Sequence, residues 1–453
     1  TINGTVNYEG NSSISRAHRW GIFPAVGVSW QFADEPFMKW SKDVLTEWKW
    51  RLSYGESGNT PSGTSPYVGT YVSEGMYMEG NAVTASTMQL NNLKWERSTE
   101  WNFGFDFNLW NGKLTGSFDY YNKKTNDLLQ KDYVVSSYLG YTNHELKYYN
   151  AGSLRNKGVE FRADWQALDT KDWKLKVNFN ISHNENEILS MPGYSEENYS
   201  FENGEYAMRI VRGTSVGSFF GYKYLGVYQN TEDTYAKDAE GNVMHDLQGN
   251  PVIMSNGTYR CYPGDAKYED LNKDGKIDKN DITYIGNSNP QLQGGGGFNL
   301  RYKNWNLTVF MHYRLGQKIV NRARMNAESM IGSDNQSTAV LRRWRNEGDQ
   351  TDIPRALWDY GLNYLGSDRF VEDCSFLRLK TLSLSYNLPK TFCQNLGLTS
   401  ANVYITGYDL FTITNYTGQD PEVNLPSNVT DLAEDNSQTP RSRRVAMGVT
   451  INF

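Results

Sequence analysis

Apolar and polar residues alternate strictly along the last nine residues of the chain. The apolar members of this pattern are Val445, Met447, Val449, Ile451 and Phe453. A period of two predicts a β-strand with one apolar face and one small or polar face. Residues 101–109 and 173–181 repeat the pattern with larger side chains. A soluble β-sandwich would turn the same faces toward its core, so alternation alone does not decide what surrounds the sheet.

Segments of this kind recur along the whole chain and are predicted to be strands. They are Thr1–Tyr8, Pro24–Phe32, Trp48–Tyr54, Leu93–Leu109, Lys113–Asn122, Lys157–Gln166, Asp172–Ser182, Gly296–Tyr302, Trp305–Tyr313, Ser375–Tyr386, Ala401–Asp409 and Val445–Phe453. The even number of strands places the C-terminus at the same end of the sheet as the turn after the second strand.

The connections between these strands are alternately short and long. The turns on one side are Ala33–Glu47, Trp110–Gly112, Ala167–Lys171, Lys303–Asn304 and Asn387–Ser400. The loops on the other side are Glu9–Phe23, Gly55–Asn92, Lys123–Asn156, His183–Gly295, Arg314–Cys374 and Leu410–Arg444, and only the first of them is short. Short periplasmic turns and long extracellular loops are typical of outer-membrane barrels. The predicted fold class is therefore all-β, a transmembrane antiparallel β-barrel with long extracellular loops.

Composition is compatible with such a barrel. Of the 453 residues 38% are hydrophobic, mean hydropathy is −0.66, and 31 Tyr, 19 Phe and 13 Trp suit aromatic girdles at the two membrane interfaces. A net charge of −6 argues against nucleic acid as a partner. Cys261, Cys374 and Cys393 lack metal-like spacing; in an oxidising compartment one pair could form a disulfide, and the sequence does not decide which pair.

Motifs spread over the whole chain match those of one family. They are GNSSISRAHRWGIFPAVGVSW at 10–30, DEPFMKW at 34–40, LSYGESGN at 52–59, LKWERSTEWNFGFDF at 93–107, YYNKKTNDLL at 120–129, NKGVEF at 156–161, GSFFGYKYLGVYQ at 217–229, PGDAKYEDLNKDGKIDKNDITYIGN at 263–287, RWRNEGDQTDIPRA at 343–356, FLRLKTLSLSYNLP at 376–389 and YITGYDLFTITNYTGQDPEVN at 404–424. With these motifs in this order, the chain resembles the C-terminal half of a SusC-like (SusC/RagA family) TonB-dependent outer-membrane transporter.

The resemblance implies a barrel of about 22 strands around an N-terminal plug. Residues 1–453 would supply about the last twelve strands, and the plug, the TonB-contacting segment and the earlier strands are expected to precede Thr1. The family implies TonB-driven import of a large nutrient across the bacterial outer membrane, together with a SusD-like surface lipoprotein and without enzymatic chemistry. The expected substrate is an oligosaccharide. An oligopeptide is the alternative within the family, and a soluble β-rich carbohydrate-binding protein is the alternative outside it.

One acidic segment has the ligand spacing of a calcium loop. The expected ligands, at positions 1, 3, 5, 7, 9 and 12 of an EF-hand-type loop, are Asp270, Asn272, Asp274, the Lys276 carbonyl, Asp278 and Asp281. Gly275 stands at position 6, where the loop turns sharply, but Asp281 is shorter than the usual bidentate Glu. A structural Ca²⁺ that orders the longest loop is the prediction, and a polar turn closed by Asx hydrogen bonds is the alternative.

The remaining motifs point to no catalytic residue. The run Gly294–Gly297 has no Walker lysine and is interpreted as a strand entry from which side chains are excluded. Aromatic residues of the loops, such as Trp344 and Trp358, are at least as compatible with loop packing as with stacking on sugars. The sequence therefore assigns no substrate-binding residue.

Overall fold

The computed structural model describes residues 1–63, 66–130, 133–134, 145–146, 148–192, 206–208, 211–422 and 432–453. Its main element is a 13-stranded sheet, which we call the wall, in which twelve strands follow one another in chain order and β27 (Thr412–Thr414) pairs with β25. The twelve are β1 (Ile2–Gly10), β2 (Trp20–Gln31), β3 (Leu45–Asn59), β6 (Glu96–Leu109), β7 (Leu114–Asn126), β12 (Ser153–Asp169), β13 (Trp173–Ser190), β21 (Leu292–Tyr302), β22 (Trp305–Leu315), β25 (Phe376–Asn387), β26 (Ser400–Tyr408) and β28 (Arg444–Asn452). Every predicted strand is confirmed.

All neighbours in the wall are antiparallel, and their register keeps one face apolar across the sheet. Phe105 of β6 lies opposite Trp50 of β3 and Phe118 of β7, whereas the next residue along β6, Gly104, lies opposite Arg51 and Asp119. The apolar face is left open, since Leu52 is 48% exposed and Met447 79% exposed. A soluble sandwich would have covered this face. The exposed apolar face is therefore the feature that favours a membrane-facing wall over the soluble alternative.

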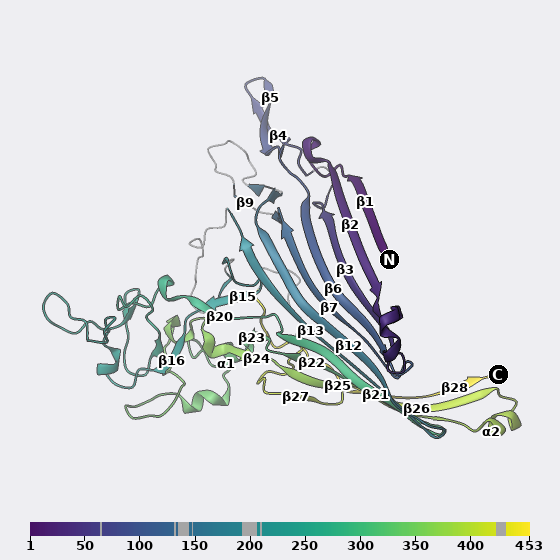
Figure 1. The fold of residues 1–453 in the computed structure, drawn as a ribbon. Coiled ribbons are helices and arrows are strands. Elements are labelled where there is room, and N and C mark those ends of the chain that lie inside the picture. Colours follow the sequence, from purple (N-terminus) through teal and green to yellow (C-terminus); the bar gives the residue numbers. More distant parts are fainter. Residues whose placement is uncertain are drawn as a thin grey trace.

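The wall is a curved sheet whose two edges are β1 and β28 (Figure 1). Among the described residues neither edge strand has a second partner in the wall, so these strands form an open part of a barrel. The predicted fold class is confirmed in this form.

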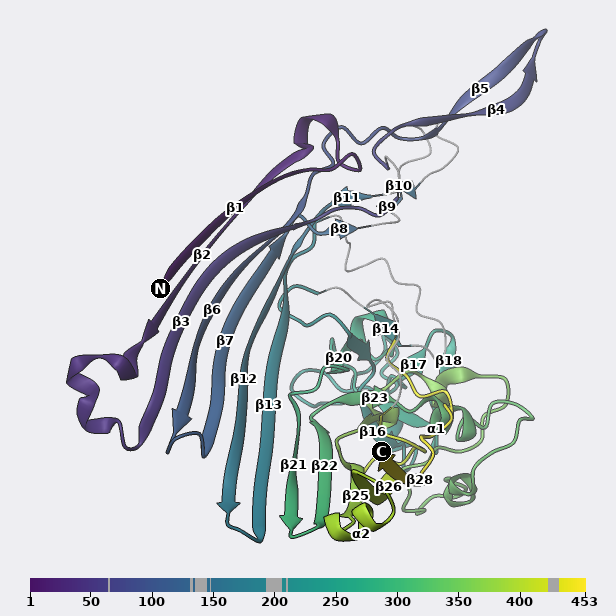
Figure 2. The ribbon, with the colours of Figure 1, turned by 90° about the vertical axis from the view of Figure 1, so that its right-hand side faces the viewer.

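The two ends of the wall differ as the loop lengths predicted. The short-turn end carries η2 (Phe32–Asp34), η3 (Pro36–Ser41) and α2 (Lys390–Asn395). The long-loop end carries a projecting hairpin of β4 (Thr70–Tyr77) and β5 (Gly80–Thr87), visible at the top of Figures 1 and 2. Small strand pairs also lie there, β8 (Leu129–Gln130) with β11 (Tyr149–Asn150) and β9 (Tyr133–Val134) with β10 (Glu145–Leu146). Parts of four predicted loops lie outside the described residues.

The described residues of 206–291 and 316–375 form a compact unit beside the wall, which we call the loop body (Figure 2). Its elements are β14 (Ala207–Met208), β15 (Ser218–Gly221), β16 (Tyr224–Val227), β17 (Ser255–Asn256), β18 (Tyr259–Arg260), β19 (Ala266–Tyr268), β20 (Thr283–Asn287), β23 (Lys318–Val320), β24 (Val371–Asp373), α1 (Arg322–Ala327), η5 (Glu232–Thr234), η6 (Lys279–Asp281), η7 (Thr338–Arg342), η8 (Gly361–Tyr364) and η9 (Asp368–Phe370). None of the helices in the described part of the chain is long and apolar enough to cross a membrane.

The loop body has a hydrophobic core of its own. One cluster packs Tyr228, Ala236 and Ile277, from the loop between β13 and β21, against Leu362 and Leu365, from the loop between β22 and β25. A second cluster joins the two loops around Phe219, Met325 and Phe370 and includes Ala433 of the last loop. The wall, by contrast, exposes its apolar side chains. Burial of apolar surface therefore orders the long loops.

Candidate functional site

The polar face of the wall carries charge pairs that cross several strands. Arg51 of β3 reaches Asp106 of β6 with Nε at 2.9 Å from Oδ2, and Asp119 of β7 with Nη1 at 2.9 Å from Oδ1. It passes over Gly104, where an added Cβ would lie 2.5 Å from Asp119 Oδ1 and 2.8 Å from the Phe118 carbonyl. Glycine at this position therefore leaves room for one guanidinium to bind two carboxylates on the side that lines a barrel.

The glycine run Gly294–Gly297 leaves space that aromatic side chains of the neighbouring strands occupy. The Tyr313 hydroxyl crosses β21 over Gly294 and donates to the Asn180 carbonyl at 3.0 Å, where an added Cβ would lie 2.7 Å from that hydroxyl. The run lies inside β21, so it forms part of the strand and not only its entry. A side chain on Gly294 or Gly297 is excluded, because an added Cβ would lie 2.2 Å from the Asn180 carbonyl oxygen or 2.0 Å from the Val309 carbonyl oxygen.

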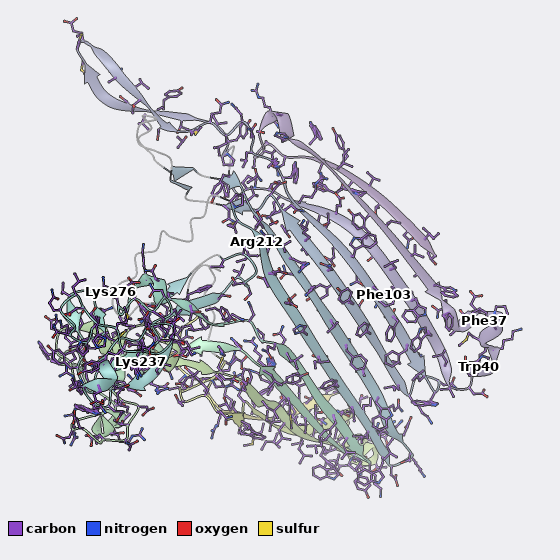
Figure 3. The ribbon with its side chains drawn as sticks, turned by 60° about the vertical axis from the view of Figure 1, so that its left-hand side comes forward. Phe37, Trp40, Phe103, Arg212, Lys237 and Lys276 are labelled. Atoms are coloured by element: carbon purple, nitrogen blue, oxygen red, sulfur yellow. The ribbon has the colours of Figure 1, made fainter. Side chains whose placement is uncertain are left out.

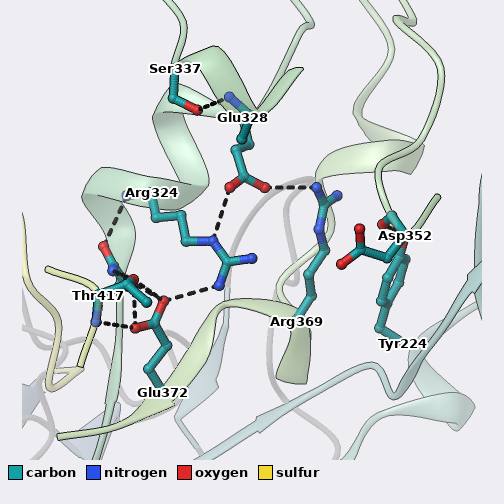
Figure 4. Close-up of polar contacts among 10 residues, drawn as sticks. Tyr224, Arg324, Glu328, Ser337, Asp352, Arg369, Glu372 and Thr417 are labelled. Atoms are coloured by element: carbon teal, nitrogen blue, oxygen red, sulfur yellow. Dashed lines mark hydrogen bonds and ion pairs between the residues drawn. The ribbon is translucent and has the colours of Figure 1, made fainter. Parts of the chain in front are cut away.

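A buried ionic network joins separate segments of the long loops (Figure 4). Arg324 binds Glu328 at 2.9 Å and Glu372 at 3.0 Å. Arg369 binds the other oxygen of Glu328 at 2.8 Å, and both of these side chains are only 5% exposed. The backbone N–H of Thr417 donates to Glu372 at 3.0 Å, which links the last long loop to the loop body. Although burial opposes the effect, bonds from Thr417 and Arg324 lower the pKa of Glu372.

The Asp-rich segment 270–281 folds as a chain of Asx-type turns. Asp270 accepts the Gly275 N–H at 2.9 Å, and Asp281 accepts the N–H groups of Leu271 at 2.8 Å and Asp278 at 2.9 Å. Gly275 has a φ of +82°, as the sharp turn at position 6 requires. The segment is fixed to the strand pair β17–β18 by the Ile277 N–H, which donates to Ser255 at 2.7 Å.

The predicted metal ligands therefore lie in one series of consecutive turns, and their side-chain oxygens accept backbone hydrogen bonds. Asn272 and Asp274 join the same pattern, since the Lys276 N–H donates to Asp274 at 2.9 Å and the Asn272 amide to Asp274 at 3.0 Å. Burial, with Asp270 and Asp278 nearby, raises the pKa of Asp281. Within the described ranges, no three His, Cys, Asp or Glu side chains converge on a metal position. This geometry matches the Asx-turn alternative, and calcium binding stays a prediction.

A polar recess of about 410 Å³ lies where β13 separates from β21. Its lining includes His183, Asn186, Thr214, Tyr284 and Asn289. The Val216 N–H donates to Asn186 at 2.9 Å, and Asn289 donates to the Val216 carbonyl at 2.8 Å, so these two amides fix the loop. Tyr284 remains 47% exposed, with its ring edge-on to Phe220 at a centroid distance of 6.0 Å.

The electrostatics of this recess suit an uncharged ligand. Its carboxylate, Glu185, is paired with Lys157 at 3.0 Å. His183 Nδ1 lies 2.6 Å from the Gln291 carbonyl oxygen. Sequence reasoning missed this recess because asparagine, threonine and tyrosine are ordinary residues of polar loops. The signal that was available is their concentration in 284–291 and 183–186.

The loop aromatics and the three cysteines differ in how far they are packed. Tyr360 stacks on Tyr259 at 4.4 Å, and Trp344 lies against Gly264, whereas Trp358 is 71% exposed. The thiols of Cys261, Cys374 and Cys393 are free and buried. Burial raises the pKa of the Cys261 thiol to about 12, which makes it unreactive at neutral pH.

Comparison with known proteins decides the family. Residues 1–319 match the family model described as "TonB dependent receptor-like, beta-barrel". The chain belongs to this family. TonB-dependent receptor P3 of Formosa agariphila is 32% identical over 464 residues, which cover 99% of this chain and 43% of that protein. The TonB-dependent receptor SusC of Bacteroides thetaiotaomicron is 28% identical over 468 residues, covering 99% of this chain and 42% of SusC.

Solved structures agree in fold. The RagAB peptide transporter superposes with a TM-score of 0.76 at 24% identity, over 100% of this chain and 46% of that one. The resemblance to SusC-like receptors and the place of the chain in the bacterial outer membrane are thereby confirmed. This receptor family is not one of enzymes, in agreement with the expectation from the sequence. The chain spans less than half the length of the curated relatives it matches.

Proposed function

We propose that the complete protein imports an oligosaccharide across the outer membrane, with energy from the TonB complex. The observation that carries this proposal is the two-faced wall in a TonB-dependent receptor chain. The open apolar face suits lipid, and the face with Arg51 and Asp106 suits a water-filled or plugged interior. The neutral recess at Tyr284 supports a sugar over a charged peptide, because neutral amides and an exposed aromatic ring suit hydroxyl-rich rings.

The substrate is tested by uptake of labelled oligosaccharides and oligopeptides into cells that express the complete protein. Tyr284→Ala is expected to weaken oligosaccharide binding by roughly 2- to 10-fold, since an aromatic contact contributes about 0.5–1.5 kcal/mol. Tyr284→Phe is the matched control and should bind nearly normally because it keeps the ring. Uptake of peptides in place of sugars, or equal binding by both variants, would contradict this assignment.

We also propose that a SusD-like lipoprotein covers the long-loop end. The loop body and the hairpin β4–β5 both project beyond the strands of the wall (Figure 2), and a permanent complex would bury more than ~2,000 Å². Purification from native membranes in mild detergent is expected to recover a second polypeptide in near-equal amount. Recovery of the barrel alone under the same conditions would count against a permanent complex.

The third proposal is a structural Ca²⁺ in segment 270–281, held by Asp270, Asn272, Asp274, the Lys276 carbonyl, Asp278 and Asp281. The raised pKa of Asp281 means that the fold disfavours its ionised form, and a cation would offset that cost. Six or seven oxygens at ~2.3–2.6 Å are the expected coordination.

Removal of Ca²⁺ is expected to speed proteolysis within Tyr268–Tyr284, and added Ca²⁺ should reverse the effect. Asp274→Asn should abolish the response to Ca²⁺. Asp246→Asn is the matched control, because Asp246 accepts similar turn bonds from Gln248 and Asn250 outside the motif. Cleavage that is indifferent to the chelator would leave an ordinary Asx-rich turn.

A further inference from the structure

The turn between β2 and β3 has an apolar side that faces away from the protein. Ala33, Met38 and Ser41 point inward and are 2%, 9% and 7% exposed. On the outer side Phe37 is 57% exposed and Trp40 is 80% exposed. A short helical turn in water normally shows the opposite arrangement, with polar residues outside.

The outer residues of this turn share a spacing. Phe37 and Trp40 stand at i and i+3 of the 3-10 helix η3, which places them on one side of it, and the 48% exposed Val44 follows in the turn after the helix. Figure 3 shows Phe37 and Trp40 at the end of β2 and β3 that lies away from the hairpin β4–β5. The stripe is therefore at the short-turn end of the wall.

This stripe continues the apolar face of the wall without a break. Trp30 lies on that face opposite Trp50. The Trp30 ring meets Phe32 edge-on at 5.0 Å, and Phe32 meets Phe37 edge-on at 5.6 Å. A row of aromatic rings thus leads from the membrane-facing strand onto the turn.

The charges of the turn favour an interface over the membrane interior. Lys39 and Lys42 flank Trp40, and Asp34 and Asp43 lie at the two ends of the turn. Glu35 accepts a hydrogen bond from the Trp30 indole at 2.8 Å, which ties the turn to the strand. Ionised groups beside exposed aromatic rings are typical of segments at the headgroup level, where rings reach the acyl chains and charges stay in water.

We propose that residues 36–44 form a membrane foot, with Phe37 and Trp40 inserted ~5–10 Å into the headgroup–acyl boundary of the phospholipid leaflet at the short-turn end. The occupant of this apolar stripe is phospholipid, because the stripe is continuous with the surface that faces the bilayer. The foot fixes the height and tilt of this side of the barrel. The inference is independent of the transported substrate.

Nitroxide accessibility in phospholipid vesicles tests this proposal in the complete protein. A spin label is placed at Trp40→Cys, which removes no buried packing because Trp40 is 80% exposed. The label is compared with Phe103→Cys on the membrane face and with Lys39→Cys on the same turn. The native thiols are buried, and labelling of the unmodified protein measures their background.

Collisions at position 40 are expected to favour oxygen over a water-soluble nickel chelate, as at position 103, whereas position 39 should favour the chelate. Chelate-dominated collisions at position 40, equal to those at position 39, would overturn the foot. Protection of position 40 from both reagents would also overturn it, because the stripe would then be covered by protein.

Discussion

Phe105→Arg is expected to lower the stability or assembly of the barrel by ~2–4 kcal/mol, the cost of a cationic side chain near the bilayer midplane. Phe105 is the middle residue of the five large apolar residues of β6. Its ring stacks on Trp48 at 4.9 Å and on Phe118 at 5.3 Å, so it lies within an aromatic ladder that crosses three strands. The measurement is the free energy of unfolding in vesicles or, in cells, the amount of folded protein in the outer membrane.

Two controls separate charge from packing. Phe105→Leu loses the ring contacts but keeps the apolar face, so it should cost less than the arginine. Asn102→Arg places the same charge on the polar face of the same strand and should assemble normally. Asn102 is a better control than Asp106, because Asp106 is bound to Arg51. Equal assembly of Phe105→Arg and Asn102→Arg would contradict the membrane-facing assignment of the apolar side.

Arg369→Leu is expected to destabilise the loop body by ~3–5 kcal/mol, the cost of breaking a buried ion pair by removing one partner. Glu328, which is 5% exposed in the intact protein, would keep only Arg324 as an ionic partner. Arg369 also lies 4.7 Å from the centre of the Phe370 ring, and this contact is lost with the charge. Native-state proteolysis of the loop body, with the wall as internal reference, measures the loss.

Lys223→Leu is the matched control for this network. Lys223 pairs with Glu269 at 2.9 Å in the same loop body but is 52% exposed, so its loss should cost ~0–1 kcal/mol. Equal proteolysis of the Arg369→Leu and Lys223→Leu variants would show that the network adds little stability.

Acid should also open the ionic network around Glu328 and Glu372. Since the pKa of Glu372 is lowered by folding, its contribution is present above the ordinary value of ~4.3 and is lost as the pH falls through the lowered pKa. Native-state proteolysis of the loop body as a function of pH measures this loss.

The wall could be predicted from the sequence because each of its strands is recognised from residues that are close together in the chain. Alternation with a period of two fixes which residues of a strand share a face, and the alternating loop lengths fix the order of the strands. The strand boundaries shifted by a few residues. For example, β3 begins at Leu45 instead of Trp48. It extends to Asn59 because its backbone pairing with β6 continues beyond the apolar stretch.

The loop body could not be predicted in the same way because its packing is long-range. Ile277 and Leu362 meet in one core although turns and charged residues separate them in sequence. Arg324, Glu328 and Arg369 likewise form a network that has no sequence period. The sequence therefore offers only the acidic turn as a means of ordering the longest loop, whereas the structure adds this core; calcium binding stays a prediction. The acidic turn itself was located correctly at 270–281.

The wall exposes its apolar side chains on its outer face, whereas the loop body buries its apolar side chains in a core of its own. The loop body joins the wall through the ends of β13, β21, β22 and β25. Substitutions on the outer surface of the loop body can therefore accumulate without altering the apolar face of the wall, as long as the contacts of the body with Thr417 and Ala433 of the last long loop are kept.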